Sequence, residues 1–135
     1  MDQLVRPGTS GTDWTAMPMP LQLFITPASN ALYILSGNAD LWTNAAGVNQ
    51  DMAITIRGGA YGSGVVIAWK ESGGFAGTFS PNAAFVQTVV PLTAGIQYVV
   101  RLAWKPNKAS TGNIYAGAGS AYPFSPTWLV AQVTN

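Results

Sequence analysis

The sequence predicts an all-β antiparallel sandwich of about 8–10 strands. Short runs of alternating apolar and polar residues recur roughly every 10–15 residues, with clusters of Gly, Pro, Ser and Asn between them. No segment keeps the 3.6-residue apolar period of an amphipathic helix. The clearest alternation runs from residue 84 to residue 105, and a turn between Pro91 and Gly95 breaks it. We expect these two stretches to pair as the central antiparallel hairpin of the sandwich.

The remaining strands are expected from the same alternation. Pro18 and Pro20 cannot donate to a β-ladder, so the first strand should lie at an edge. Gly37 and Asn38 interrupt a strand that is apolar on both faces, and we expect a bulge or bend there. In chain order, these strands are expected at residues 14–19, 21–26, 31–36 with a continuation over 39–43, 51–57, 65–70, 114–116 and 127–133.

The rest of the chain is expected to form an N-terminal arm and surface loops. Residues 1–13 are rich in Pro, Gly, Ser and Thr, which predicts an extended arm that is either frayed or docked on a neighbouring subunit. Residues 14–135 are expected to form one domain. Glycine-rich loops are expected at residues 58–64, 71–82 and 117–126, and long loops are where binding sites often lie.

The composition favours an assembly over a free monomer. Apolar residues make up 48% of the 135 residues, whereas charged residues make up only 8%, and the net charge is +1. Ordinary soluble domains contain roughly a quarter charged residues. Either Ser, Thr, Asn, Gln and Gly keep the surface hydrated, or self-association buries much of it. We favour self-association.

The inventory of reactive side chains argues against an enzyme. The chain has no cysteine and no histidine, which removes the thiolate nucleophile, the usual general base and the commonest metal ligand. Asp40 and Asp51 could approach each other across the loop at residues 44–49, as a glycosidase or a calcium site would need. Solvated acids at the ends of a loop are the simpler interpretation. We therefore expect no catalytic residues, no cofactor and no metal site.

Nucleic-acid and membrane partners are not expected either. Arg101 and Lys105 share one strand face, but a net charge of +1 gives little attraction for phosphates. No apolar run approaches the ~20 residues of a membrane-spanning helix. The start of the chain is polar and unlike a signal peptide.

Five aromatic residues in the expected loops are candidates for partner binding. They could stack on sugar rings, as in a lectin, or they could plug the ends of the sandwich core and contact other subunits. These residues are Tyr61, Phe75, Phe79, Tyr122 and Phe124.

Several phrases of the sequence occur together in a familiar order. They are TDWTAMP at residues 12–18, the two-sided apolar strand at 31–36, VNQDMAITI at 48–56, the strand begun by PLTAG at 91–104, and NIYAGAG followed by FSPTWLVAQV. This order resembles the compact jelly-roll domains of phage structural proteins and related bacterial surface proteins. More broadly, it is similar to the C1q and tumour-necrosis-factor superfamily. The similarity covers most of residues 12–134.

The resemblance implies a β jelly roll that forms a homotrimer. In such proteins an aromatic-rich outer face meets the neighbouring subunits. The chain lacks the Gly-X-Y repeats of a collagen-like stalk, which favours attachment to a phage capsid or tail. The implied subunit interface contains Tyr98, Trp104, Tyr115 and Trp128, with an ordinary core position as the alternative for each.

These expectations together describe a non-enzymatic structural protein. It would decorate or build a phage capsid or tail through the N-terminal arm and the loops, with itself and capsid or tail proteins as partners. We expect it in the virion, or otherwise outside the cell or at a cell surface. The alternative is a carbohydrate-binding module or lectin that binds glycans with the loop aromatics.

Overall fold

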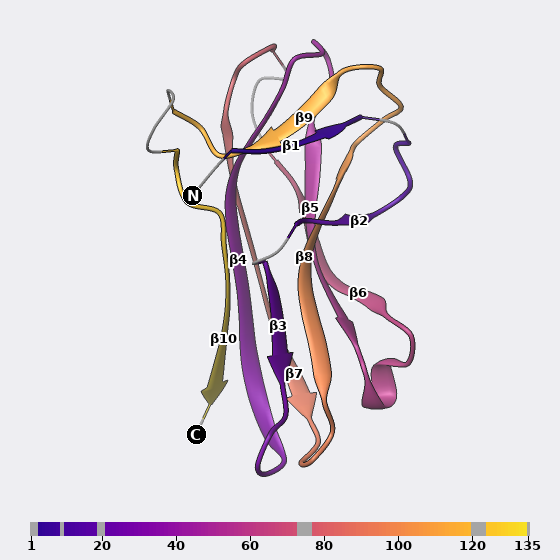
Figure 1. Ribbon diagram of the computed structural model, residues 1–135, viewed down its shortest axis with the longest axis vertical. Coiled ribbons are helices and arrows are strands. Elements are labelled where there is room, and N and C mark those ends of the chain that lie inside the picture. Colours follow the sequence, from indigo (N-terminus) through magenta and orange to yellow (C-terminus); the bar gives the residue numbers. More distant parts are fainter. Residues whose placement is uncertain (1–2, 9, 19–20, 73–76, 120–123, 135) are drawn as a thin grey trace.

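The chain folds into a sandwich of two antiparallel sheets, as the computed structural model shows (Figure 1). The residues that it describes are 3–8, 10–18, 21–72, 77–119 and 124–134. Within these ranges, sheet A contains β1 (Leu4–Pro7), β9 (Asn113–Ala116), β4 (Ala31–Thr43), β10 (Trp128–Thr134) and β7 (Asn82–Leu92). Sheet B contains β2 (Thr15–Ala16), β3 (Gln22–Ile25), β8 (Tyr98–Pro106), β5 (Gln50–Arg57) and β6 (Val65–Glu71). The predicted all-β jelly-roll sandwich is confirmed.

The expected strands are present, with small shifts at their ends. The largest shift is in the first, where, among the described residues 14–18, the strand pairing comprises Thr15 and Ala16. The expected loop at 58–64 contains one turn of 3₁₀ helix, η1 (Gly59–Tyr61). Across the described ranges, no helix has the length and apolar character needed to cross a membrane.

The expected hairpin between β7 and β8 is wrong. β7 pairs with β4 in sheet A, whereas β8 pairs with β5, β3 and β2 in sheet B. The turn between them therefore passes from one sheet to the other, and Gly95 in this turn donates its N–H to the carbonyl of Pro27 at 2.9 Å. Each strand still buries one apolar face. The apolar face of β7 and that of β8 lie on opposite sides of the core instead of next to each other in one sheet.

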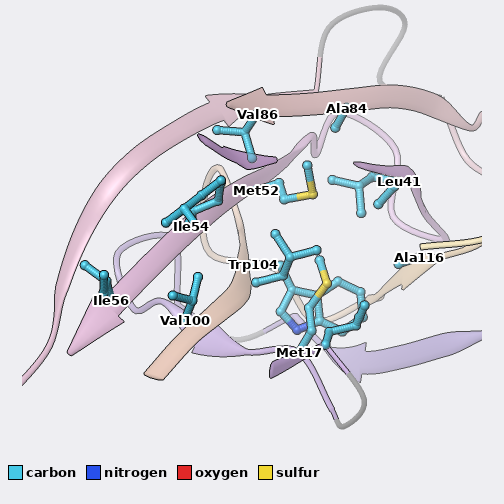
Figure 2. Close-up of a cluster of buried hydrophobic side chains, with 14 of the residues drawn as sticks. Met17, Leu41, Met52, Ile54, Ile56, Ala84, Val86, Val100, Trp104 and Ala116 are labelled. Atoms are coloured by element: carbon cyan, nitrogen blue, oxygen red, sulfur yellow. The ribbon is translucent and has the colours of Figure 1, made fainter. Parts of the chain in front are cut away.

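The core fills the space between the sheets. Figure 2 shows Ala84 and Val86 of β7 directed toward the same space as Met52 and Ile54 of β5. The inward residues of β8 complete the other side of the cluster, and Trp104 among them is 1% exposed. Burial of these apolar side chains at roughly 25 cal/mol per Å² is the main force that holds the sheets together.

Gly37 is buried in the middle of β4 and has a packing role. The pairing of β4 with β7 runs in continuous register through Gly37 and Asn38, so the expected bulge or bend is wrong. A Cβ atom on Gly37 would lie 2.4 Å from Cδ2 of Leu102 in the opposite sheet. Glycine is needed there because the Leu102 side chain approaches the β4 backbone closely.

Two strands, β9 and β10, pair with the same edge of β4. β7 takes one edge of β4, and β9 and β10 share the other, with β9 above β10 in Figure 1. Ala116 pairs with Leu41, and Trp128 pairs with Asn38. Trp128 comes twelve residues after Ala116 in the chain, whereas their partners on β4 are only three residues apart. The chain therefore has nine more residues here than the pairing with β4 uses, and at the described ends of this segment the N–H of Ser125 bonds the Ala118 carbonyl at 2.7 Å.

The N-terminal segment lies against its own chain where it is described. Within the expected arm at 1–13, β1 pairs with β9 at the edge of sheet A. Arg6 donates from Nη1 to the carbonyl of Trp104 in sheet B at 3.0 Å, so this segment ties the two sheets together. Loss of hydration lowers the pKa of Arg6, and the charge of Asp13 opposes that shift.

Candidate interaction surfaces

The outer face of sheet A (the A face) consists of the outward residues of β7, β4 and β10. Every second side chain of a strand points away from the core, and the register aligns these positions in rows across the sheet. One row contains Val89, Ile34 and Gln132. The outward residues are Ala83, Phe85, Gln87, Val89 and Pro91 of β7; Leu32, Ile34, Ser36, Asn38, Asp40 and Trp42 of β4; and Trp128, Val130, Gln132 and Thr134 of β10.

The A face is apolar and open to solvent. Four of its apolar side chains are about half exposed: Leu32 at 50%, Phe85 at 49%, Val89 at 55% and Val130 at 48%. Asp40 is the one charged residue among its outward positions. Exposed apolar side chains gathered on one face of a sheet are typical of an interaction surface.

A shallow depression of about 520 Å³ lies at one end of the A face. It is lined by outward residues of all three strands, Leu32, Pro91 and Thr134, and by the turn residues beside them. The depression gives the apolar face a concave element that a protruding side chain of a partner could fill.

The outer face of sheet B (the B face) is more charged, because it carries five charged residues beside the exposed apolar side chains of Phe24 (58%), Trp69 (59%) and Val66 (38%). The ammonium Nζ of Lys105 pairs with Oδ2 of Asp51, whose side chain is 4% exposed. Lys105 also donates to the carbonyl of Gly11 at 2.9 Å and lies 5.2 Å from the ring centre of Trp14. The charged residues of the B face are Asp51, Arg57, Glu71, Arg101 and Lys105.

An aromatic cluster lies at one end of the A face, where β4 meets β9. The rings of Trp42 and Tyr115 stack at 3.9 Å with an interplanar angle of 8°. Phe79 packs on Trp42 at 5.5 Å and is 67% exposed, with a left-handed backbone (φ 56°) that a bulky residue rarely adopts. Trp42 and Phe79, with Pro81, Ala118 and Gly119, border a depression of about 260 Å³.

Two of the four predicted interface residues belong to the core instead. Tyr98 and Trp104 are each 1% exposed, and both point inward from β8. Tyr98 uses its hydroxyl to accept the N–H of Thr93 at 3.0 Å. The assignment of these two residues to a subunit interface is corrected, because an interface residue needs an accessible side chain in the free chain.

The other two predicted interface residues point outward from sheet A. Trp128 is half-buried on the A face, and its ring meets that of Phe85 at 6.2 Å in an edge-on arrangement. Tyr115 belongs to the aromatic cluster. Their placement leaves both accessible to a neighbouring subunit.

The predicted loop aromatics divide between different places. Tyr61 packs against the core, donates its hydroxyl to the carbonyl of Pro91 at 3.2 Å, and lies 6.0 Å from the ring of Tyr98. Burial, and then the neighbouring Tyr98, raise the pKa of Tyr61 above its ordinary value. Phe79 is in the aromatic cluster and Phe124 is half-buried beside Gly117. Phe75 and Tyr122 lie outside the described residues.

The suggested approach of Asp40 to Asp51 does not occur. Asp40 points outward from sheet A and Asp51 points outward from sheet B, so the whole sandwich separates them. In the described part of the chain, no group of three or more Asp or Glu residues is placed to hold a metal ion.

Sequence reasoning missed the strand residues that make up the A face. Phe85, Val89 and Val130 were visible as alternating apolar positions, but alternation does not say which side of a strand faces the core. The informative signal was the apolar character of both sides of residues 31–36 and 85–90. A strand that is apolar on both sides either lies between two layers or has an apolar surface for a partner.

Comparison with known proteins gives no functional assignment. The sequence matches no family model, and it matches no curated protein. Among solved structures, the chain is similar to the Eiger TNF of S. frugiperda, with 12% identity and a TM-score of 0.40 over 74% of this chain and 67% of that one. A likeness at this level carries no argument, so the jelly-roll assignment rests on the two-sheet topology described above.

Proposed function

We propose that the protein is a non-enzymatic structural protein that self-associates through the A face as a homotrimer. The trimer decorates or builds a larger assembly, a phage capsid or tail. It acts through shape and burial, and the loops at 58–64, 71–82 and 117–126 meet the partner surface.

The contrast between the two outer faces supports this proposal. The A face has one charged residue and four half-exposed apolar side chains, whereas the B face has five charged residues. Removal of apolar surface from water is worth roughly 25 cal/mol per Å², and the A face offers this with almost no charge to desolvate. A second copy of the same chain is a suitable partner, because most soluble oligomers are homo-oligomers with closed symmetry.

The number of subunits is supported by the sequence resemblance to trimeric jelly rolls. The apolar A face supports self-association without fixing the number three. A cyclic trimer would leave the B face and the long loops outside, where they are available to the capsid or tail.

The test introduces a charge into the middle of the A face. Val89→Asp places a carboxylate in the row formed by Val89, Ile34 and Gln132, and desolvation of this carboxylate should prevent association. Val66→Asp is the matched control, because Val66 is also partly exposed, at 38%, but lies on the B face. By size-exclusion chromatography with light scattering at micromolar concentration, we expect trimers for the wild type and Val66→Asp and monomers for Val89→Asp.

A wild-type protein that remains a stable monomer in the same experiment would contradict the proposal. Loss of the trimer in both variants would also contradict it, because association would then not depend specifically on the A face. The assembly itself is tested by the gene neighbourhood, where we expect genes for capsid, portal or tail proteins. Sugar-uptake genes in their place would favour the alternative below.

The alternative is carbohydrate binding by the aromatic cluster. The depression beside Trp42 and Phe79 is the observation in its favour, because aromatic faces stack on sugar rings. On a glycan array, specific binding that is lost in Phe79→Ala and kept in Trp69→Ala would support this function. Trp69 is a suitable control since it is 59% exposed and lies on the opposite sheet.

A further inference from the structure

A small pocket on the B face brings two arginines together. Arg57 of β5 and Arg101 of β8 line a cavity of about 110 Å³, with Ser63 and Gly64 from the turn before β6 as another wall. The register pairs Thr55 with Arg101 and Arg57 with Val99, so the two arginines are diagonal neighbours on one face of adjacent strands. Side chains in that relation are within reach of each other.

No acidic side chain neutralises this pair in the described part of the chain. The single ion pair there joins Lys105 to Asp51, at the other end of the B face. Glu71 accepts hydrogen bonds from Asn107 and Asn49, beside that ion pair. Like charges at neighbouring strand positions repel, and an anion between them would convert the repulsion into attraction.

The guanidinium groups are positioned to bind a ligand. Arg101 donates through Nε to the side-chain oxygen of Gln22, which fixes its orientation and leaves its two Nη groups for another acceptor. No hydrogen bond or ion pair among the described residues engages the guanidinium of Arg57. Both arginines stand on paired strands of the sheet, so the site needs no rearrangement of a loop.

We propose that this pocket, the Arg57–Arg101 pocket, binds a tetrahedral oxyanion, a sulfate or phosphate group. Planar guanidinium forks match the oxygens of such groups and form charge-assisted hydrogen bonds with them. The volume equals a few water molecules at ~30 Å³ each, so the pocket holds the oxyanion and leaves any attached ring outside. Phe24, which is 58% exposed and pairs with Val99, offers that ring an apolar surface.

The experiment measures sulfate and phosphate binding to the full chain by calorimetry and by amide chemical shifts. The wild type should bind inorganic sulfate saturably, with the largest shifts at residues 55–57, 63–64 and 99–101. Arg57→Gln and Arg101→Gln should each weaken binding about tenfold or more, because each removes charge-assisted hydrogen bonds. Lys70→Gln is the matched control, since it removes the same charge from an exposed position of β6 and should change the affinity less than about twofold.

Two further arms sharpen the outcome. Arg101→Lys keeps the charge but loses the fork, so we expect it to bind more weakly than the wild type. Glucose 6-phosphate and glucosamine 6-sulfate, compared with the unmodified sugars, tell whether the natural ligand is a sugar ester or the free ion. Tighter binding of the ester indicates the former and equal binding the latter, and both support the Arg57–Arg101 pocket.

The proposal fails if the wild type binds no oxyanion, or if Lys70→Gln weakens binding as much as Arg57→Gln does. The second result would mean that only overall charge matters. Melting temperatures measured without ligand establish whether each variant is folded. If Arg101→Gln does not fold, Arg57→Gln alone tests the proposal, because Arg57 is exposed. This test is independent of the trimer, because the A face is on the other sheet.

Discussion

Lys105 and Asp51 show how single side chains stabilise this protein. Their ion pair is covered by the N-terminal segment, through the carbonyl of Gly11 and the ring of Trp14. Both side chains are mostly withdrawn from water, at 13% and 4% exposure. A pair this deeply placed is sensitive to the loss of one partner, because the remaining charge then lacks both water and a counter-ion.

Lys105→Met should therefore lower the free energy of unfolding by about 3–5 kcal/mol. The measurement is urea unfolding at one fixed protein concentration. The double variant Asp51→Asn with Lys105→Met should recover much of this loss, since no charge is then left buried. Lys70→Met, at an exposed position of the edge strand β6, is the control and should stay within about 0.5 kcal/mol of the wild type. A similarly small effect of Lys105→Met would contradict the interpretation.

The contact between Gly37 and Leu102 is a second case at this scale. A methyl group on Gly37 would overlap Cδ2 of Leu102, so Gly37→Ala should cost about 1–3 kcal/mol through overpacking. Leu102→Val shortens the facing side chain, and the combination with Gly37→Ala should be less destabilising than the sum of the two single changes. A double-mutant cycle in urea measures this coupling, and strict additivity would show that the two residues do not compete for space.

At the scale of elements, the notable feature is the strand position shared by β9 and β10. Gly117 still donates to the carbonyl of Asp40 at 2.8 Å, so the ladder continues one step past β9 before the chain leaves the sheet. It returns with Thr127 buried and Trp128 paired to Asn38. The nine extra residues therefore separate β9 from β10 without changing which positions along this edge of β4 face the core.

Deletion of residues 118–126 should join β9 to β10 in register. Gly117 would pair with Asp40, Thr127 with Ala39 and Trp128 with Asn38, and loop-closure entropy changes by only about 1 kcal/mol for a loop of this size. We expect the deletion variant to keep the wild-type far-ultraviolet circular dichroism spectrum and a similar unfolding midpoint.

Deletion of residues 119–126 is the control for this experiment. It leaves one extra residue, and a shift by one would turn the inward residues of β10 outward. This variant should accommodate the extra residue as a bulge or lose several degrees of melting temperature. Equal stability of the two deletions would show that the register of β10 is not fixed by its pairing with β4.

At the scale of the whole molecule, the two sheets differ in what their outer faces present to water. The A face has one charged residue among its outward positions, whereas the B face has five. The proposed trimer buries the first face and leaves the second in solvent.

The trimer predicts that thermal stability depends on protein concentration. Association with other subunits stabilises the folded state by mass action. The melting temperature of the wild type should therefore rise as the protein concentration increases from about 1 to 100 μM. Val89→Asp should show a lower melting temperature that does not change with concentration. Calorimetric scans at several concentrations measure both, and a concentration-independent wild type would contradict self-association.

The sequence by itself determined where most of the strands and turns lie, although β1 falls within the expected arm. Residues 50–57 and 98–106 form strands because their apolar residues repeat with a period of two, and Gly95 allows the backbone of a turn (φ 73°). These signals are local, since they depend on neighbours within a few positions. The composition likewise indicated a protein with an apolar surface.

Only the tertiary structure decided which strands pair and which side of each faces the core. The same alternation in residues 84–105 fits a hairpin or two strands in opposite sheets, because both arrangements bury one face of each strand. Alternation likewise could not tell that Tyr98 and Trp104, which the resemblance assigned to an interface with a core position as the alternative, lie in the core. The pocket of Arg57 and Arg101 was equally hidden, since the two residues are far apart in the chain and meet only when β5 pairs with β8.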